Sequence, residues 1–508
     1  MAQGILPFKY ETEKNTTGMT ALAGLPAYLD LIQATELSKS IEKHLKVREG
    51  GQGWTDSQTV LALVLLNLAG GDCVDDIKML EADDGFCEVL KKSEMHGLKR
   101  KVKRAVLRRW RKEKTRTFPA PSSIFRYLAK FHNKEQEGLR QPGRAFIPAQ
   151  NEHLRGFAGI NKELAAFLSF QNIESTATLD MDATLVSTNK IDALFSYKGD
   201  KAYQPLNTWW FEQGITLHTE FRDGNVPAGF EQLRVFKEAL DCLPEQVKKV
   251  RLRSDTAGYQ HKLLRYCATG KNRRFGVIEF AIGCNVTKEF KEAVAQVEES
   301  EWKPIYKTAY GKKYKTGTEW AEVCYVPNAI GHSKKDPVYR YLAKREALDK
   351  QQELPDMDTQ IMFPFPTMDI EDCRYKVFGI VTNMDWEGEK LIHWLHERCG
   401  KSEEVHAVMK DDLAGGKLPS DDFGENAAWW WIMILALNLN AIMKKLAMGV
   451  SLVPKRMKAI RFSFINLPGR VVTRSRSLLI RLTKNNPAME LLINAREKIA
   501  MLQPVPSG

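Results

Sequence analysis

Three acidic residues occupy positions where carboxylates can hold metal ions. Asp182 lies on a mainly apolar strand predicted over residues 176–186, and Asp255 directly follows a strand predicted over residues 247–254. Glu403 lies on a helix predicted over residues 386–412. Carboxylate oxygens suit Mg²⁺, a hard cation that retains several waters. Two such ions about 3.5–4 Å apart can activate the attacking oxygen of a phosphodiester reaction and stabilise the leaving oxygen.

Each candidate acid has a competing interpretation. Asp180 shares a strand face with Asp182, because strand side chains alternate. Glu404 adjoins Glu403, whereas Lys410 follows Glu403 by seven residues, nearly two turns of a regular helix. A single aspartate on a strand is more often a turn or hydrogen-bonding residue than a metal ligand. The acids therefore predict a metal site only if the fold brings them together.

The elements around these acids alternate between strands and helices. A strand pair over residues 209–221 is followed by an amphipathic helix over 230–240, and a helix over 259–267 follows Asp255. A strongly apolar strand is predicted over 375–383. This order indicates an α/β core, and Asp255 falls at the carboxyl end of a strand, where such sheets usually place their sites.

The first 170 residues are predicted to be mainly helical. Thr55, Asp56 and Ser57 precede an apolar run over residues 60–66, which predicts a capped helix that Gly70 and Gly71 end.

Residues 98–116 form a strongly basic segment in which Glu113 is the single acid. Its eleven positive residues are Lys99, Arg100, Lys101, Lys103, Arg104, Arg108, Arg109, Arg111, Lys112, Lys114 and Arg116. Val102, Val106, Leu107 and Trp110 interrupt the charges at roughly helical spacing, so one edge can pack while the rest contacts phosphates. A solvated charged face is the alternative, but these charges repel one another without a counterion.

A second basic helix is predicted over residues 124–131, after the chain break at Pro119 to Pro121. It carries Arg126 and Lys130. Together with the preceding basic helix it gives the outline of a helix-turn-helix, although any two helices joined by a turn can mimic that outline.

The composition agrees with a folded protein that binds polyanions. The 508 residues carry a net charge of +12, which favours nucleic acid or acidic surfaces. The eight cysteines show no C-x-x-C pair, which argues against structural zinc and a disulfide scaffold. No signal peptide is visible, and the apolar stretch 427–439 is shorter than a membrane span, so a buried helix fits it better. We therefore expect a cytoplasmic protein without a membrane partner.

Four ordered motifs resemble the DDE transposases of bacterial insertion sequences, specifically the insertion-sequence group thirteen-eighty. They are Asp-Ala-Thr from Asp182, Leu-Arg-Ser-Asp-Thr-Ala-Gly-Tyr over residues 252–259, Arg-x-Gly-x-Ser-Glu from Arg398 running on to Met-Lys-Asp-Asp-Leu-Ala-Gly-Gly-Lys-Leu-Pro-Ser, and Phe-Gly-Glu-Asn-Ala-Ala-Trp-Trp from Phe423. The resemblance covers residues 175–450 well and the N-terminal part loosely. Together the motifs are specific, although each alone is weak.

The resemblance implies an α/β fold with an RNase H-like catalytic core and a β-rich insertion domain, preceded by a mainly helical N-terminal DNA-binding region. The expected parts are the helical region 1–170, the first part of the core 171–274, the insertion domain and linker 275–370, the second part of the core 371–450, and a basic C-terminal region 451–508.

The resemblance also assigns the site residues. Asp182, Asp255 and Glu403 are the expected catalytic residues and ligands of two Mg²⁺ ions, which Mn²⁺ can replace. Lys410 is expected to hold a phosphate, and Arg398 is expected to contact DNA. The family's tyrosine and arginine steps fall on His396 and Cys399 instead, which leaves the third acid the least secure.

The implied reaction is hydrolytic nicking at the ends of the element, after which the freed 3′-hydroxyl attacks the opposite strand or target DNA. The expected partners are double-stranded DNA, as transposon ends and target, and a second copy of the chain in a homodimer. The expected location is the bacterial cytoplasm, in association with the nucleoid. Trp302 and Trp320 are candidates to stack on a flipped base, although a Trp in a β-rich domain is more often part of the core.

Two other functions fit the same residues. One is a DNA-binding regulator derived from a transposase, with a core that no longer cuts. The other is a metal-dependent nuclease that cuts without strand transfer.

Overall fold

The computed structural model describes residues 17–48, 53–113, 116–309, 311–327, 336–348, 365–370, 373–474 and 477–504. The chain forms two compact units. Unit 1 comprises Met1–Gly138, Ala149–Phe167 and Val408–Gly508, and unit 2 comprises Leu139–Pro148 and Leu168–Ala407.

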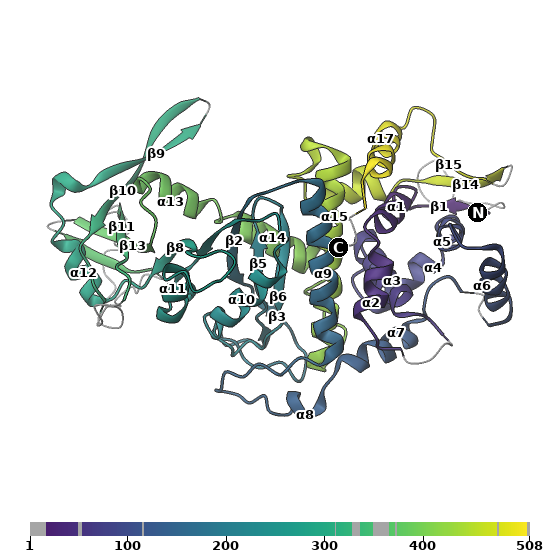
Figure 1. Ribbon diagram of the computed structural model, residues 1–508, viewed down its shortest axis with the longest axis horizontal. Coiled ribbons are helices and arrows are strands. Elements are labelled where there is room, and N and C mark those ends of the chain that lie inside the picture. Colours follow the sequence, from purple (N-terminus) through teal and green to yellow (C-terminus); the bar gives the residue numbers. More distant parts are fainter. Residues whose placement is uncertain are drawn as a thin grey trace, which may run out of the picture. The chain divides into compact units, whose positions relative to one another are not determined.

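Unit 2 contains, within the described residues, a ten-stranded mixed sheet (Figure 1). Its order is β6-β5-β2-β7-β8-β13-β11-β10-β9, and β12 pairs with β13. The strands are β2 (Thr176–Ala183), β5 (Leu206–Trp210), β6 (Ile215–Glu220), β7 (Lys249–Ser254), β8 (Glu279–Cys284), β9 (Lys303–Ala309), β10 (Lys312–Val323), β11 (Arg340–Ala347), β12 (Thr367–Ile370) and β13 (Cys373–Thr382). A separate pair is formed by β3 (Val186–Ser187) and β4 (Ala202–Tyr203).

Parallel strands lie in the middle of this sheet. β2, β7 and β8 run parallel to one another. The β5–β6 hairpin continues the sheet antiparallel on one side, and β13, β11, β10 and β9 continue it antiparallel on the other. Residues 177–181 of β2 are all buried, as expected for a strand that is covered on both faces.

The helices of unit 2 connect these strands. They are α10 (Gln232–Cys242), η3 (Thr256–Gly258), α11 (His261–Ala268), α12 (Lys288–Ala295), η4 (Glu299–Glu301), α13 (Gly388–His396) and α14 (Lys401–Ala407).

The sequence places the start of a distinct β-rich insertion after residue 274, but the structure joins this region to the core sheet. β8 pairs with β7, and β9, β10 and β11 extend the same sheet through β13. Backbone pairing between strands so far apart in sequence depends on tertiary register, which strand patterns do not encode.

Unit 1 is mainly helical. Its helices are α1 (Pro26–Ala34), α2 (Leu37–His44), α3 (Asp56–Ala69), η1 (Val74–Asp76), α4 (Ile77–Glu81), α5 (Asp84–Glu94), α6 (Arg100–Glu113), α7 (Pro121–Leu128), η2 (Ala129–Phe131), α8 (Lys134–Glu137), most of α9 (Glu152–Gln171), η6 (Val408–Asp412), α15 (Phe423–Ile442), η7 (Met443–Met448), η8 (Val450–Leu452), α16 (Met457–Ile460), η9 (Arg461–Ile465) and α17 (Ala488–Met501). A three-stranded sheet joins β1 (Met19–Thr20), β14 (Gly469–Arg474) and β15 (Ser477–Arg481).

The capped helix predicted near residue 60 is confirmed as α3. Thr55 accepts a hydrogen bond from the backbone N–H of Gln58, and Gln58 caps Thr55 in return. Gly70 ends the helix at φ 104°, a left-handed conformation that glycine adopts readily. The second basic helix, α7, begins at Pro121 rather than Ile124, because proline is well suited to the first helical turn.

Helix α15 lies at the centre of unit 1 and is almost entirely buried. Its polar residues are satisfied inside the core: Asn440 accepts a hydrogen bond from Tyr28 (2.8 Å), and Asn438 donates one to Asn161 (2.7 Å). Residues 423–448 are long and apolar enough to cross a membrane, but 78% of the most apolar window is buried inside the fold. This agrees with the predicted buried helix.

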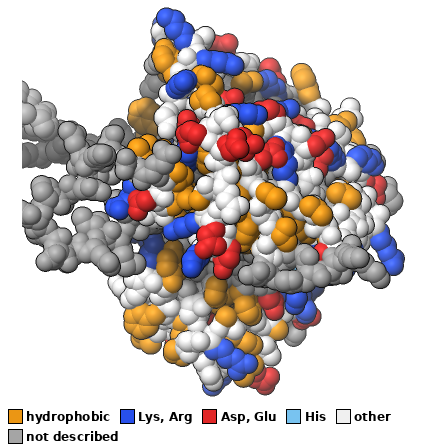
Figure 2. All heavy atoms as spheres, turned by 90° about the vertical axis from the view of Figure 1, so that its left-hand side faces the viewer, with side chains coloured by type: hydrophobic (Ala, Val, Ile, Leu, Met, Phe, Trp, Pro, Cys, Tyr) orange, Lys and Arg blue, Asp and Glu red, His pale blue; other side chains and the backbone are white. Residues whose placement is uncertain are grey.

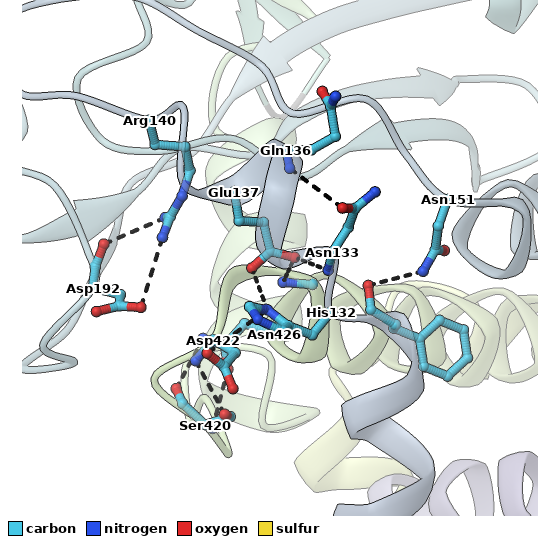
Figure 3. A network of polar contacts seen from close by, with 12 residues as sticks. His132, Asn133, Gln136, Glu137, Arg140, Asn151, Asp192, Ser420, Asp422 and Asn426 are labelled. Carbon is cyan, nitrogen blue, oxygen red and sulfur yellow. Dashed lines mark hydrogen bonds and ion pairs between the residues drawn. The ribbon is translucent and has the colours of Figure 1, made fainter.

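A polar network fixes the N-terminal end of α15 (Figure 3). Glu137 accepts hydrogen bonds from the backbone N–H of Asn133 (2.7 Å) and of Gly424 (3.2 Å), and His132 contacts it at 2.7 Å. A Cβ atom at Gly424 would lie 2.2 Å from the carbonyl oxygen of Phe131. Glycine is therefore required where the two segments meet.

The helix predicted over residues 386–412 is interrupted in the structure. α13 ends at His396, and α14 begins at Lys401 after Gly400, which has φ 78°. From Val408 the helix continues as the π-helix η6. A positive φ ends an α-helix, which apolar periodicity alone does not reveal.

Candidate active site

Asp182 and Asp255 lie at the same edge of the unit 2 sheet. The parallel pairing of β2 with β7 ends with Met181 opposite Ser254, whose hydroxyl donates to the Met181 carbonyl oxygen (3.3 Å). Asp182 and Asp255 are the next residues on the two strands. The fold therefore brings the first two predicted acids to neighbouring positions.

The carboxylate of Asp180, the alternative to Asp182, pairs with the buried guanidinium of Arg253. Its two carboxylate oxygens accept hydrogen bonds from Arg253 at 2.6 and 2.9 Å. Arg253 also donates to the Trp394 carbonyl oxygen (2.6 Å) and to Glu397 (3.2 Å), and its guanidinium lies 4.4 Å from the ring centre of Phe211. A carboxylate held in this way is a structural ion-pair partner, which favours Asp182 as the metal ligand.

Burial raises the pKa of Asp182, as it does the pKa of Asp180. The pKa of Asp182 is raised to about 6, by burial first and by the negative charge of Asp255, against the lowering effect of the nearby Arg398. Arg398 lies 3.3 Å from the Asp182 carboxylate, whose side chain is 24% exposed. The negative charge of Asp255 therefore acts on Asp182, and Arg398 balances the charge of the Asp182 carboxylate.

Asp255 is exposed and held at the start of a tight turn. Its carboxylate accepts hydrogen bonds from the backbone N–H of Ala257 (3.1 Å) and from the hydroxyl of Ser254 (3.4 Å). Two carboxylates on adjacent strand ends suit a divalent cation that takes one or two protein carboxylates and keeps several waters. In the part of the chain that the structure describes, no group of three acids, histidines or cysteines could hold a metal ion.

The predicted third ligand does not join this pair in the structure. Glu403 and Glu404 are both exposed in the first turn of α14, and neither carboxylate has a side-chain partner within the described residues. That Glu403 and Lys410 share one helix face stays a prediction. Lys410 lies in η6, where Leu413 donates to the Val408 carbonyl oxygen five residues back (2.9 Å), so the α-helical spacing does not continue.

Sequence reasoning missed Arg253 and Glu397 beside the acids. Asp180 and Arg253 are register partners on β2 and β7. An aspartate in the buried part of β2 and an arginine at its partner position on β7 are a usable signal for a buried ion pair, once the register is known.

Positive charge gathers beside the Asp182–Arg398 pair. Burial first, and then the positive charges of Lys344, Arg398 and Lys307, lower the pKa of His396 to about 4. The residue at the family's tyrosine step is therefore a neutral imidazole at neutral pH, with Lys307 of β9 and Lys344 of β11 near it.

Trp320 does not fit a base-stacking role in this structure. Its side chain is 3% exposed and packs with Leu342, Ile380 and Leu391, and a Cβ atom at Gly388 would lie 2.2 Å from its ring. Trp302 is also buried, with the Arg345 guanidinium 4.1 Å from its ring centre. A buried indole cannot stack on a base, so both tryptophans are core residues here.

The predicted DNA-binding cations lie on helices of unit 1, apart from Arg398. Within α6 and just before it, the exposed ones are Lys99, Arg100, Lys101 and Arg104. Lys103 is half-buried, and the side chains of Arg108 and Arg109 lie outside the described residues. Arg126 and Lys130 are also exposed.

The apolar edge predicted to pack α6 against the fold is partly exposed. Val102 is 45% exposed and Leu107 is 37% exposed, whereas Val106 is half-buried and the side chain of Trp110 lies outside the described residues. The helix itself is confirmed over Arg100–Glu113.

Comparison with known proteins places the chain in a family. The structure is similar to a piggyBac transposase in its synaptic complex with hairpin DNA, with 13% sequence identity over 88% of this chain and 81% of that chain, and a TM-score of 0.41. No curated protein matches the sequence. A family model, transposase DDE domain group 1, matches residues 10–504, nearly the whole chain. The chain therefore belongs to the DDE transposase family, whose members depend on a divalent metal ion.

Proposed function

We propose that this transposase binds the inverted-repeat ends of an insertion sequence, cuts DNA by two-metal-ion hydrolysis and joins the 3′-hydroxyl ends to target DNA. The observation that carries the proposal is the adjacent placement of Asp182 and Asp255 at the carboxyl ends of β2 and β7, in a chain that matches the family over residues 10–504. The motifs around both acids support the insertion-sequence group thirteen-eighty and a bacterial origin.

An RNase H-like core is the fold we propose for the catalytic part. The central parallel strands β2, β7 and β8, flanked by the antiparallel β5–β6 hairpin, support this assignment. The acids then lie where open α/β sheets usually place their sites, outside the carboxyl ends of the strands.

Asp182 and Asp255 would hold the divalent metal, for which we propose Mg²⁺, and Glu403 is the proposed third ligand. When bound, the metal ions supply activation of the attacking oxygen and stabilisation of the leaving oxygen. Ser254 and the Ala257 N–H orient the Asp255 carboxylate. Arg398 is close enough to Asp182 to balance its charge and then to contact a scissile-strand phosphate.

Binding to DNA is proposed for the exposed cations of α6 and α7, and for Lys410. The exposure of Lys99, Arg100, Lys101 and Arg126 supports this role, because cations that neutralise phosphates must reach the surface. We further propose that two copies act together on the DNA, since two ends have to be paired.

The test is cleavage and joining of duplex DNA that carries terminal inverted repeats, with Mg²⁺, by the wild type and by Asp182→Asn. We expect nicked and joined products from the wild type and none from Asp182→Asn, whereas the surface control Asp75→Asn keeps activity. Tight DNA binding by the wild type without any cleavage would contradict the proposal that the chain is an enzyme. Cleavage without joined products would instead indicate a nuclease.

A further inference from the structure

One face of the β14–β15 hairpin of unit 1 is made mainly of arginines and of the apolar pair Val472 and Leu479, of which Val472 is half-buried. Arg470 pairs directly with Arg481, Val472 with Leu479, and Arg474 with Ser477. Because strand side chains alternate, these residues share one face of the sheet. All three arginines are exposed, and Leu479 is 40% exposed.

The opposite face of the same hairpin is the one that packs on the protein. Val471 is buried, and Ile480 packs against the small core of Ala23, Leu467 and Ala488. Thr473 donates a hydrogen bond to Glu88 (2.8 Å). The arginine face is therefore the outward face, and the hairpin extends beside α5 (Figure 1).

None of the three arginines has an ion-pair partner within the residues that the structure describes. Some other arginines with accessible side chains do have one: Arg234 pairs with Glu231 and Glu238, and Arg496 pairs with Asp30. Like charges directly opposite each other on neighbouring strands destabilise a sheet. The Arg470–Arg481 pair is thus an unfavourable arrangement for the isolated hairpin, and an anion between the two side chains would relieve it.

The surface drawn in Figure 2 gives a contrast. Apart from the residues in grey, acidic, basic and apolar side chains are mixed there. The hairpin face differs because its charged residues all have one sign.

We propose that the β14–β15 hairpin is a DNA-contacting ribbon whose three arginines bind phosphates of duplex DNA. β1 pairs with β14 only at Gly469 and Arg470, and beyond them β14 and β15 form a two-stranded ribbon. A two-stranded β-ribbon fits the major groove of B-DNA, and arginine binds phosphate with a planar, bidentate geometry. This surface is separate from α6 and α7 in the sequence and was not among the predicted DNA-binding residues. The proposal rests on the proposed function, because it needs a chain that works on duplex DNA.

The test compares four proteins for binding to a duplex of arbitrary sequence across a salt series. They are the wild type, Arg470→Gln/Arg474→Gln/Arg481→Gln, the charge-preserving Arg470→Lys/Arg474→Lys/Arg481→Lys, and a matched control, Lys39→Gln/Lys43→Gln/Lys78→Gln. The control removes three positive charges from lysines of unit 1 that already pair with Glu36, Glu163 and Asp75. Thermal unfolding checks that all four are folded.

Log affinity falls as log salt rises, and we expect this fall to be less steep in the glutamine variant. The steepness should drop by about 0.9 for each phosphate that is no longer neutralised, and thus by up to about 3. The lysine variant and the control should keep slopes near that of the wild type. A glutamine variant that matches the control overturns the hairpin proposal and leaves the proposed function standing. A hairpin effect without Mg²⁺-dependent cleavage contradicts the proposed function alone, and a wild type that does not bind duplex DNA contradicts both.

Discussion

At the scale of single residues, two aspartates on one strand face have opposite roles because their partners differ. Asp180 is buried and held by Arg253 through two hydrogen bonds. Asp182, two residues on, has one cation at 3.3 Å and a second acid on the neighbouring strand. In the first arrangement a buried arginine takes up both carboxylate oxygens, whereas the second keeps a carboxylate at an energetic cost that a metal ion can offset.

Asp182→Asn should stabilise the metal-free protein at about pH 8 and leave it unchanged at about pH 4. The folded pKa of Asp182 is about 6, above its ordinary 3.8. The stability from its retained proton is therefore full below the unfolded pKa and is lost as the pH rises through about 6. Asparagine is neutral at every pH, so the variant does not lose this stability as the pH rises. We expect a gain of about 1–2 kcal/mol, smaller than the full shift implies because the side chain is partly solvated.

The measurement is urea unfolding with a chelator at both pH values. Adding Mg²⁺ should then stabilise the wild type and not the variant, because a ligand that binds only the folded state raises its stability. If the variant is no more stable than the wild type at about pH 8, the ionised carboxylate of Asp182 does not destabilise the folded state. Asp75→Asn, a substitution at an exposed ion pair with Lys78, is the control, and it should change the stability by less than about 1 kcal/mol at either pH.

The residue-level site was partly predictable from the sequence. The Asp-Ala-Thr and Leu-Arg-Ser-Asp motifs singled out Asp182 and Asp255, and the structure places these two side by side. Arg253 was not predicted, because its role depends on the register between β2 and β7. No pattern within either strand contains that register.

At the scale of elements, the segment from α13 to η6 shows where periodicity fails. A regular apolar spacing predicts a single helix over residues 386–412, but Gly400 breaks it and the last turn is a π-helix. The ends of helices were predicted better than breaks inside them, as Thr55 and Gly70 at the two ends of α3 show. A cap is a local hydrogen-bond pattern, whereas a break depends on what the two flanking helices pack against.

The third acid is a prediction about this broken segment. We expect Glu403→Gln to abolish DNA cleavage and Glu404→Gln to leave it within a few fold of the wild type. The two glutamates have the same charge and are both exposed in the first turn of α14, so each controls for the other. Metal-dependent cleavage rates at saturating DNA give the measurement, and the reverse result would assign the third ligand to Glu404.

At the scale of the whole molecule, the chain forms two compact units, and the residues from Val408 belong to the helical one. That the segment 371–450 completes the catalytic core stays a prediction. The buried character of α15 was predicted from its composition. Its packing partners were not, because a helix that is apolar on all sides shows that it is buried without showing against what.

The net charge of +12 belongs to the whole chain, and we expect two of its basic surfaces to contact DNA phosphates. Reversing the charges of Lys99, Arg100, Lys101, Lys103 and Arg104 to glutamate should weaken duplex binding and flatten its salt dependence. If α6 and the β14–β15 hairpin contact different phosphates, the reductions in slope from the two sets of substitutions should add. Binding across a salt series measures this in the separate and the combined variants. An unchanged slope would remove α6 from the interface, and a combined reduction no larger than either single one would mean that the two surfaces do not contact the DNA at the same time.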